Sequence, residues 1–589
     1  MILKALYDYY DRRKNNLPDA NMAMVNYMYA ILIDSEGKFQ GLEPLGGEDG
    51  LTILTFRPEE RTSAPVAHCM GDNGSYVLGL KGIKADKTIE FEKELQKNKK
   101  NHQAFKDDVD NIYRSLPQNK YANAVHGFYQ NYGKDLLLQM CENEYWSDLC
   151  GKLNKNITFR IVGEKALAAS DKDIIRHKIE NVTNLNKEAI CMITGEKAKP
   201  VSTTYSTFIV GGKSNAKLVS FQVDSGYDSY GKKMGLNAPI SEVAEFKYTT
   251  ALLAMLSKGS RNRFQIGTRT FLFWVSQNNE VGQEAEDSFF NLFRFNEQED
   301  NPNKNIEQVR KVFESIYKGS LKTTSEDTFY ILGLAPNSAR IAVTYWAEIP
   351  LRKFAETICK HFDDMEVIVK RQDKRPYTGL RNMISAVTLG GKVSDATPNL
   401  PEAVAKSIFE GLPYPQTLFA SCMRRIRAEN SKDKYEEAFR KGYIITRAAI
   451  IKGYLNRLKD NQQKIKIMLD KDNTNQGYLC GRLFAVLDKI QDDANKQHSI
   501  RERYMNAASS TPAAVFATIL NLSSHHSEKL NEGRKIFFEK IKQEIIGKIS
   551  AEGFPTHLDL QDQGRFFVGY YHQMQDLYTK NNNEQISDN

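Results

Sequence analysis

The pattern of apolar positions changes near Pro350. Before that residue most apolar positions fall in short extended runs separated by turns rich in Gly, Asn, Asp and Pro, which is typical of strands. Strands are predicted at residues 24–33, 51–56, 75–80, 157–162, 207–210, 218–223, 271–275, 329–334 and 341–346. Helical spacing interrupts them at 90–110, 242–257 and 304–318.

After Pro350 apolar residues recur at spacings of three and four, which predicts helices. The predicted helices span 351–363, 401–410, 415–428, 434–459, 478–493, 512–530, 534–549 and 559–578. Thr511, directly before Pro512, and Asp559 are predicted to cap two of them. The helix at 534–549 has Ile and Phe on one face and Lys and Glu on much of the other. Such one-sided helices must pack against neighbours, as in a bundle.

These patterns predict an α+β protein, with a mixed α/β N-terminal domain of mainly antiparallel strands followed by an all-α C-terminal helical bundle. With 589 residues, one core is not expected, because single cores divide beyond roughly 250–300 residues. We expect three parts, at 1–350, 351–467 and 468–589. The middle part would be a helical connecting domain, separated from the last bundle by the polar stretch 460–477.

Composition indicates a soluble globular protein, with 41% hydrophobic and 26% charged residues. The seven cysteines are odd in number and form no C-x-x-C pair, which favours a reducing cytoplasm over a disulfide framework. No apolar stretch is long enough to cross a membrane. The net charge of +8 permits a polyanionic partner without requiring one.

Motifs for catalysis are weak, and we expect no enzyme activity, no cofactor and no metal. Residues 211–214, GGKS, resemble the end of a phosphate-binding loop, but Thr207 occupies the position of the motif's first glycine. His525 and His526 are adjacent, so on a helix they point about 100° apart and do not form a metal pair. Ser75 lies in G-S-Y-V rather than in G-x-S-x-G.

Three other features fit nucleic acid better. The first is the turn Gly71–Tyr76, where the Asn73 amide offers a donor and an acceptor to a base edge and Ser75 lies two residues further on. From spacing alone an ordinary Asx turn explains this segment better.

The second feature is the segment 220–239, SFQVDSGYDSYGKKMGLNAP. Glycines let the backbone approach a duplex, lysines neutralise phosphate, and tyrosines stack or wedge. The predicted DNA-reading residues here are Gly226, Tyr227, Tyr230, Lys232 and Lys233. A long surface loop explains the same composition equally well.

The third feature is a set of scattered basic groups that could contact DNA or RNA backbones. They comprise Arg261, Arg263, Arg269, Lys370, Arg371, Lys374, Arg375, Arg424 and Arg427. On a helix Arg424 and Arg427 fall on one side, with Arg425 turned away. Each group alone also fits a solvated charged face.

Several long strings, in the same order, resemble the large subunit of the bacterial type I-C CRISPR surveillance complex, Cascade. They are MILKALYDYYDRR at 1–13, DNGSYVLG at 72–79, SFQVDSGYDSYGKKMGLNAPIS at 220–241, FYILGLAPNSARIAVTYW at 329–346, GLPYPQTLFASCMRRIR at 411–427, YLCGRLFAVLDKIQ at 478–491 and FPTHLDLQDQGRFFVGYYHQ at 554–573. The resemblance runs from the first residue nearly to the last.

The resemblance implies a non-catalytic subunit that reads a protospacer-adjacent motif in double-stranded DNA and promotes duplex opening and R-loop formation. Base pairing with the guide supplies sequence specificity in such systems, while protein reads only the short flanking motif. The implied partners are crRNA, the target duplex and its displaced strand, the Cascade backbone and crRNA-end-capping subunits, and a helicase-nuclease that cuts.

In this family the small subunit also arises from an internal translation start within the same gene. Met468 opens the corresponding C-terminal segment here. A start at Met505 would delete the predicted helix 478–493, and Met468 as an ordinary linker residue remains an alternative.

Two other classes of protein stay open. The string His361-Phe362-Asp363-Asp364 weakly resembles the metal ligands of a nuclease, although a charged helix end explains it better. A scaffold that binds only proteins would contain the basic groups without using them on nucleic acid.

Overall fold

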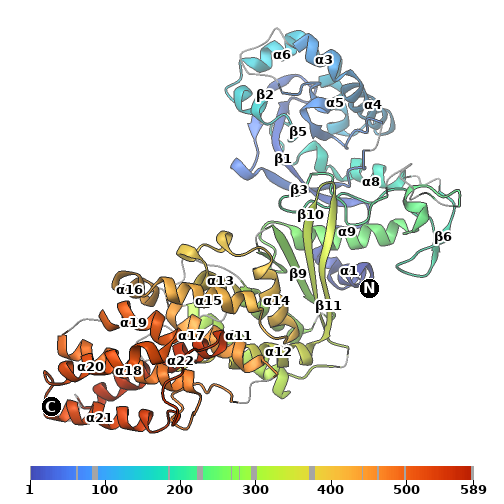
Figure 1. The fold of residues 1–589 in the computed structure, drawn as a ribbon. Helices are drawn as coiled ribbons and strands as arrows, with labels where there is room; N and C mark the ends of the chain where they lie inside the picture. The colour runs from blue at the N-terminus through green and yellow to red at the C-terminus, as the bar shows by residue number, and fades with distance from the viewer. Residues whose placement is uncertain are drawn as a thin grey trace. The chain divides into compact units, whose positions relative to one another are not determined.

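The computed structural model describes residues 2–61, 64–82, 91–182, 186–221, 228, 230–266, 268–277, 279–293, 302–324, 326–369, 379–440, 442–459, 463–495 and 499–584. The chain forms two compact units, one of residues 1–260 and 335–343, the other of residues 261–334 and 344–589 (Figure 1). Each unit has its own hydrophobic core. The predicted boundaries after residues 350 and 467 both fall inside the second unit, and they stay predictions.

The first unit is built on a five-stranded sheet centred on one long strand, β1 (Met22–Ile33). Its strands are β1, β2 (Phe39–Pro44), β3 (Leu51–Phe56), β4 (Gly71–Asn73) and β5 (Asn156–Ile161). β1 pairs antiparallel with β3 through its first half and with β2 through its second half, and parallel with β5. The other pair, β4 with β5, is antiparallel, as expected for most strands.

Helices connect and cover this sheet (Figure 1). They are α1 (Ile2–Arg13), α2 (Gly74–Val77), α3 (Phe91–Lys97), α4 (Lys99–Ser115), α5 (Lys120–Gln130), α6 (Lys134–Cys141), α7 (Trp146–Gly151), α8 (Lys172–Glu180) and α9 (Glu242–Leu256). Between α8 and α9 lie the two-stranded hairpin β6 (Ala189–Ile190) and β7 (Lys197–Ala198) and a largely irregular segment. α1 packs on α9, where Lys247 lies 2.6 Å from Asp11.

The second unit contains a four-stranded sheet in the order β11-β10-β9-β8, two helices between β9 and β10, and further helices after β11. The strands are β8 (Arg263–Ile266), β9 (Arg269–Val275), β10 (Thr328–Asn337) and β11 (Arg340–Pro350), with the tip 335–343 grouped with the first unit. The helices are α10 (Glu280–Phe293), α11 (Pro302–Lys318), α12 (Leu351–Met365), α13 (Leu380–Val387), α14 (Leu400–Glu410), α15 (Gln416–Ala428), α16 (Lys432–Arg440), α17 (Tyr443–Arg457), α18 (Gln476–Asn495), α19 (Ser499–Ser510), α20 (Pro512–Ser527), α21 (Glu532–Ile546) and α22 (Leu560–Glu584). The α+β prediction is confirmed.

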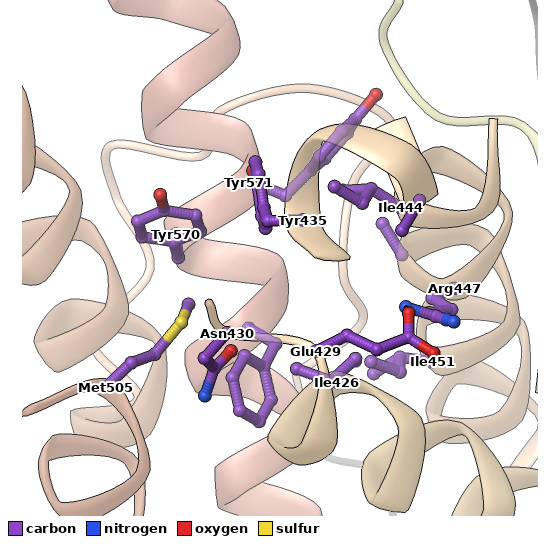
Figure 2. Close-up of a pocket in the computed structure, with 13 residues that line it drawn as sticks. Ile426, Glu429, Asn430, Tyr435, Ile444, Arg447, Ile451, Met505, Tyr570 and Tyr571 are labelled. Atoms are coloured by element: carbon purple, nitrogen blue, oxygen red, sulfur yellow. The ribbon is translucent and has the colours of Figure 1, made fainter. Parts of the chain in front are cut away.

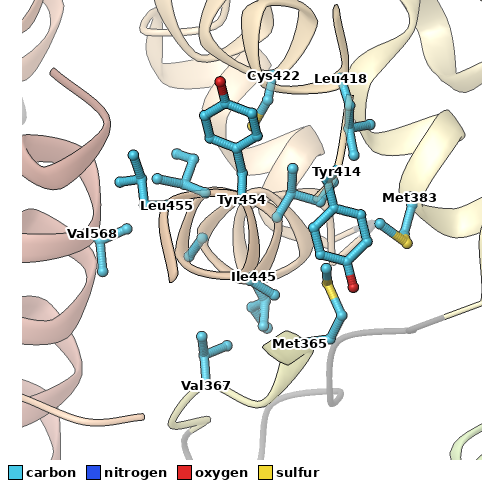
Figure 3. Packing of buried hydrophobic residues seen from close by; sticks show 14 of the residues in the cluster. Met365, Val367, Met383, Tyr414, Leu418, Cys422, Ile445, Tyr454, Leu455 and Val568 are labelled. Carbon is cyan, nitrogen blue, oxygen red and sulfur yellow. The ribbon is translucent and has the colours of Figure 1, made fainter. Parts of the chain in front are cut away.

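α17 runs through the middle of this core. Its Ile445, Tyr454 and Leu455 point in several directions and meet side chains of α12, α13, α15 and α22 (Figure 3). Lys452 is also buried, and its ammonium donates to the carbonyls of Asp363 and Asp364 at the end of α12. The Asp363 carbonyl also accepts from the Glu366 amide at 3.3 Å, so the lysine ammonium is an additional donor to the carbonyls at this helix end.

α18 and α22 approach until their backbones touch. A Cβ added to Gly481 would lie 1.9 Å from the carbonyl oxygen of Phe566, and one added to Gly569 would lie 2.3 Å from that of Tyr478. Only glycine permits this separation, and the pair forms the centre of the C-terminal helices.

Five local predictions are wrong. Residues 75–80 begin as helix α2 because Asn73 caps a helical turn, and neither 207–210 nor the described residues 218–221 form a strand. The helix predicted at 434–459 is two helices, since Gly442 adopts φ 70° before α17. Thr511 does not cap α20 with its side chain, because its hydroxyl donates to Ala507 of the preceding helix. Asp559, in contrast, accepts from the Asp562 amide as predicted.

The contact between α18 and α22 yields a stability prediction. Gly481→Ala places a methyl group against backbone, and we expect it to lower the free energy of unfolding by about 2 kcal/mol or more. Gly533→Ala in α21 is the matched control, because its nearest atom would be 3.8 Å away and alanine favours helix. Thermal unfolding should separate the two variants, and equal midpoints would contradict the close contact.

Candidate nucleic-acid interface

The Asn73 side chain caps helix α2. Its Oδ1 accepts hydrogen bonds from the Ser75 amide at 3.0 Å and from the Ser75 hydroxyl at 2.6 Å. Its Nδ2 donates to Asp72 Oδ1 at 3.2 Å. Asn73 is half-buried and Ser75 is buried. The oxygen and the nitrogen of the Asn73 amide are therefore both used within the turn. A base edge could bind the amide only by replacing these hydrogen bonds.

Buried charged and aromatic side chains hold the Asn73 turn in place. The Asp72 carboxylate is fully buried and accepts from the Arg61 guanidinium and from the His68 amide. The Arg61 guanidinium also lies 3.9 Å from the centre of the Tyr76 ring. On the other side His102 Nδ1 donates to the Tyr76 carbonyl at 2.8 Å. The turn is consequently rigid.

The second predicted feature contains a turn that closes on itself. The Asp228 carboxylate accepts from the Met234 amide at 3.1 Å, and the Asn237 amide donates to the carbonyls of Lys232 and Met234. The Gly235 amide in turn donates to the Ser202 carbonyl at 2.9 Å, which fastens the turn to the preceding segment. Gly226 and Tyr227 lie outside the described residues.

This turn presents Tyr230, Lys232 and Lys233 to solvent. Tyr230 is 99% exposed, an extreme value for an aromatic residue. Its backbone is left-handed at φ 53°, as is that of Gly231 at φ 74°. Neither lysine has an ion-pair partner among the residues that the structure describes. The sequence predicted the exposed residues Tyr230, Lys232 and Lys233 but not Asp228 and Asn237, which close the turn. Their positions on either side of Gly231 and Gly235 could have indicated this role.

Two of the predicted arginines of the second unit, Arg261 and Arg269, are paired with carboxylates. Arg261 lies 2.9 Å from Asp287, and Arg269 forms an ion pair with Glu402 and donates to Asn399. Arg263 lies on β8. Paired guanidinium groups have less to offer a phosphate than unpaired ones. Lys370, Arg371, Lys374 and Arg375 fall outside the described residues.

Arg424 and Arg427 on α15 differ from each other. Arg424 is exposed and donates to the Ser421 hydroxyl at 2.7 Å. Arg427 is half-buried and donates to the Gln563 side chain on α22. Arg427 thus joins the connecting helices to the C-terminal segment, and Arg424 faces solvent.

Met468 lies in the irregular segment between α17 and α18 and is 56% exposed. The segment that begins there shares its core with the preceding helices. The Arg501 guanidinium lies 3.8 Å from the ring centre of Tyr435 on α16, and the Tyr571 hydroxyl donates to the Ile368 carbonyl at 2.6 Å.

A mostly apolar cavity lies where the segment after Met468 meets the preceding helices (Figure 2). Glu429 and Arg447 lie together on one side, 2.7 Å apart, with Tyr570 and Met505 on the opposite side. Its walls come from α15, α16 and α17 and from α19 and α22. The cavity therefore lies between helices that precede Met468 and helices that follow it.

The nuclease-like string at 361–364 is not arranged around a metal. His361 is fully buried and its Nδ1 lies 2.8 Å from the Tyr414 hydroxyl. Asp363 and Asp364 instead face Arg310 and Arg457. Within the described ranges no cluster of three potential metal ligands occurs, and no helix is long and apolar enough to span a membrane.

The chain belongs to a family of CRISPR-associated proteins. The family model described as CRISPR-associated protein (Cas_Csd1) matches residues 6–578, nearly the whole sequence. No curated protein matches the chain. The matched range includes the loops described above and all but the first five and last eleven residues of the two compact units.

His102, which supports the Asn73 turn, should make stability depend on pH. Burial lowers its pKa to about 4, because its second ring nitrogen is enclosed without a partner. The unfolded chain binds a proton below pH about 6.5 while the folded chain does not, so stability falls as pH falls from there toward 4.

We expect a loss of about 2 kcal/mol at pH 5 relative to pH 7 from this residue. His102→Asn keeps the donor to Tyr76 and should remove that part of the pH dependence in denaturant unfolding. His557→Asn, at an exposed histidine, is the control. An unchanged pH dependence in His102→Asn would show that His102 titrates normally.

Proposed function

We propose that this protein is the non-catalytic large subunit of a crRNA-guided type I-C Cascade. Its match to the CRISPR-associated family over residues 6–578 carries the proposal. In this role the chain recognises the protospacer-adjacent motif in duplex DNA, promotes R-loop formation and docks the helicase-nuclease. The guide supplies sequence specificity, so the protein needs only a small reading surface and backbone contacts.

The turn at 228–237 is the best supported contact with DNA. It is fastened at its base by Gly235 and places Tyr230, Lys232 and Lys233 in solvent. Exposed lysines without carboxylate partners are free to neutralise phosphates. The Asn73 turn is a weaker candidate, since its amide already caps α2.

Replacing both Lys232 and Lys233 by Ala should weaken binding of the assembled complex to target duplex several-fold. Loss of two phosphate contacts should also lower the slope of log affinity against log salt by about 2. The double change Lys14→Ala, Lys155→Ala removes equal charge from exposed lysines elsewhere and is the control. Unaltered affinity and salt slope would eliminate this turn as a contact, and guide assembly should be normal in both variants.

Asn73→Ser tests base reading at the other turn. Serine also caps helices, so the fold of α2 should persist while the amide is lost. If Asn73 reads a base, binding should lose its preference for the motif without weakening toward unrelated duplexes. Unchanged motif preference, measured by competition between duplexes, would assign Asn73 to structure alone.

We also propose that translation from Met468 supplies the small subunit from the same gene. Residues 468–589 form a product of 122 residues and roughly 14 kDa, which is 67.1 kDa scaled by 122/589. Expression of the gene alone should yield this second band, and Met468→Leu should abolish it. A persistent band with the same N-terminus, by mass spectrometry, would refute the start at Met468.

A further inference from the structure

Residues 207–216 form a closed loop in the first unit. The Thr207 amide donates to the Ala216 carbonyl at 2.7 Å, and two turn bonds follow, from Gly212 to Ile209 and from Ala216 to Lys213. Gly211, at φ 79°, gives the loop its reversal. These bonds hold the loop in one conformation, and a Cβ added to Gly211 would lie 3.5 Å from Pro336 at the end of β10.

Side chains alternate along the outgoing arm of this loop. Thr207 and Ile209 are buried, whereas Phe208 is 54% exposed and Val210 is 42% exposed. Extended backbone sends successive side chains to opposite sides, so Phe208 and Val210 project outward together. Phe208 is the one large exposed phenylalanine in the described part of the chain. Gly211, Gly212 and exposed Lys213 follow Val210.

The turn with Tyr230 has the same sequence of features. An exposed aromatic ring is followed by Gly231 and by Lys232 and Lys233. Both elements are attached to the short segment 202–207. The turn is hydrogen-bonded to it through Gly235 and Ser202, and the loop begins at Thr207. Five residues span at most about 18 Å, which limits the separation of the two bases.

Lysines near these two elements divide into two groups. Lys217, between them in sequence, is 2.9 Å from Glu60 and also donates to Thr203 and Thr204. Lys213, Lys232 and Lys233 have no carboxylate partner among the described residues. The charges that could face a polyanion are thus those at the two loop tips.

We propose that the loop 207–216 and the turn 228–237 together bind single-stranded nucleic acid. Phe208 and Tyr230 stack on unpaired bases, and Lys213, Lys232 and Lys233 contact the phosphates between them. Aromatic platforms combined with a positive surface bind single strands with little sequence preference. The inference rests on the proposed function for its two sources of ligand, the displaced DNA strand and the guide RNA.

The test measures fluorescence anisotropy of labelled mixed-sequence 20-nucleotide DNA and RNA strands with the purified full chain. Phe208→Ala should weaken single-strand binding about tenfold, because stacking on one aromatic residue is worth that much or more. Phe208→Trp should retain affinity, and Phe208→Leu should behave like Phe208→Ala, since leucine is apolar but has no ring. Lys213→Ala should weaken binding and reduce its salt dependence.

Tyr145→Ala, at another partly exposed aromatic residue, and Lys155→Ala are the matched controls. Stronger loss with DNA than with RNA would identify the displaced strand as the ligand, and the reverse would identify the guide. Wild-type affinity in Phe208→Ala, or equal affinities of the Leu and Trp variants, would overturn the proposal. In the second case the loop is an apolar docking surface for protein.

This test is separate from that of the proposed function. Phe208 takes no part in the duplex experiment with Lys232 and Lys233. Loss of single-strand binding in Phe208→Ala with no motif-dependent duplex binding would support the inference and refute motif recognition. Normal duplex binding with unaffected single-strand binding would do the opposite.

Discussion

The close contact of α18 with α22 governs the helical part of this protein. Because glycines bring two backbones together, α18 is buried on nearly all sides and its polar groups must find partners inside. Arg482 therefore donates to Gln573 at 3.0 Å and pairs with Glu544, and Asp488 accepts from the Tyr570 hydroxyl at 2.8 Å. Most of these partners lie on α22, so the same contact that removes water also supplies the hydrogen bonds that replace it.

Beside its hydrophobic core, the first unit has a segment that is held mainly by backbone hydrogen bonds. The segment between β7 and α9 has little regular structure, yet its amides are bound to Ser202, Ile240 and Ala216. This bonding fixes where the chain turns while leaving the side chains at the tips uncovered. A surface of this kind suits a ligand with a regular charged backbone and variable bases.

The spacing of apolar residues correctly predicted those helices and strands whose local sequence preference agrees with the contacts they make in the fold. α9 and β1 fall close to their expected limits. At 207–210 a strand was predicted, and buried and exposed side chains do alternate there, but a strand also needs a partner and the Thr207 amide bonds within its own loop. At Ser75 a β-prone run follows a capping asparagine, and the cap decides the outcome.

The residues of the candidate site could be predicted from the sequence, but the ion pairs of the basic residues could not. Tyr230, Lys232 and Lys233 were identified because glycine, tyrosine and lysine share one segment. That Arg269 is neutralised by Glu402, 133 positions later, could not follow from sequence, because ion pairs form between residues that folding brings together.

The hairpin of β10 and β11 has a consequence for the order of folding. Its tip, 335–343, belongs to the first unit, where the Ile341 amide donates to the Lys217 carbonyl at 3.0 Å. At synthesis rates of about 5–20 residues per second, roughly 4–17 s separate residue 260 from residue 343 on the ribosome. During that interval the nascent first unit lacks its last piece. A fragment ending at residue 260 would remain in that unfinished state.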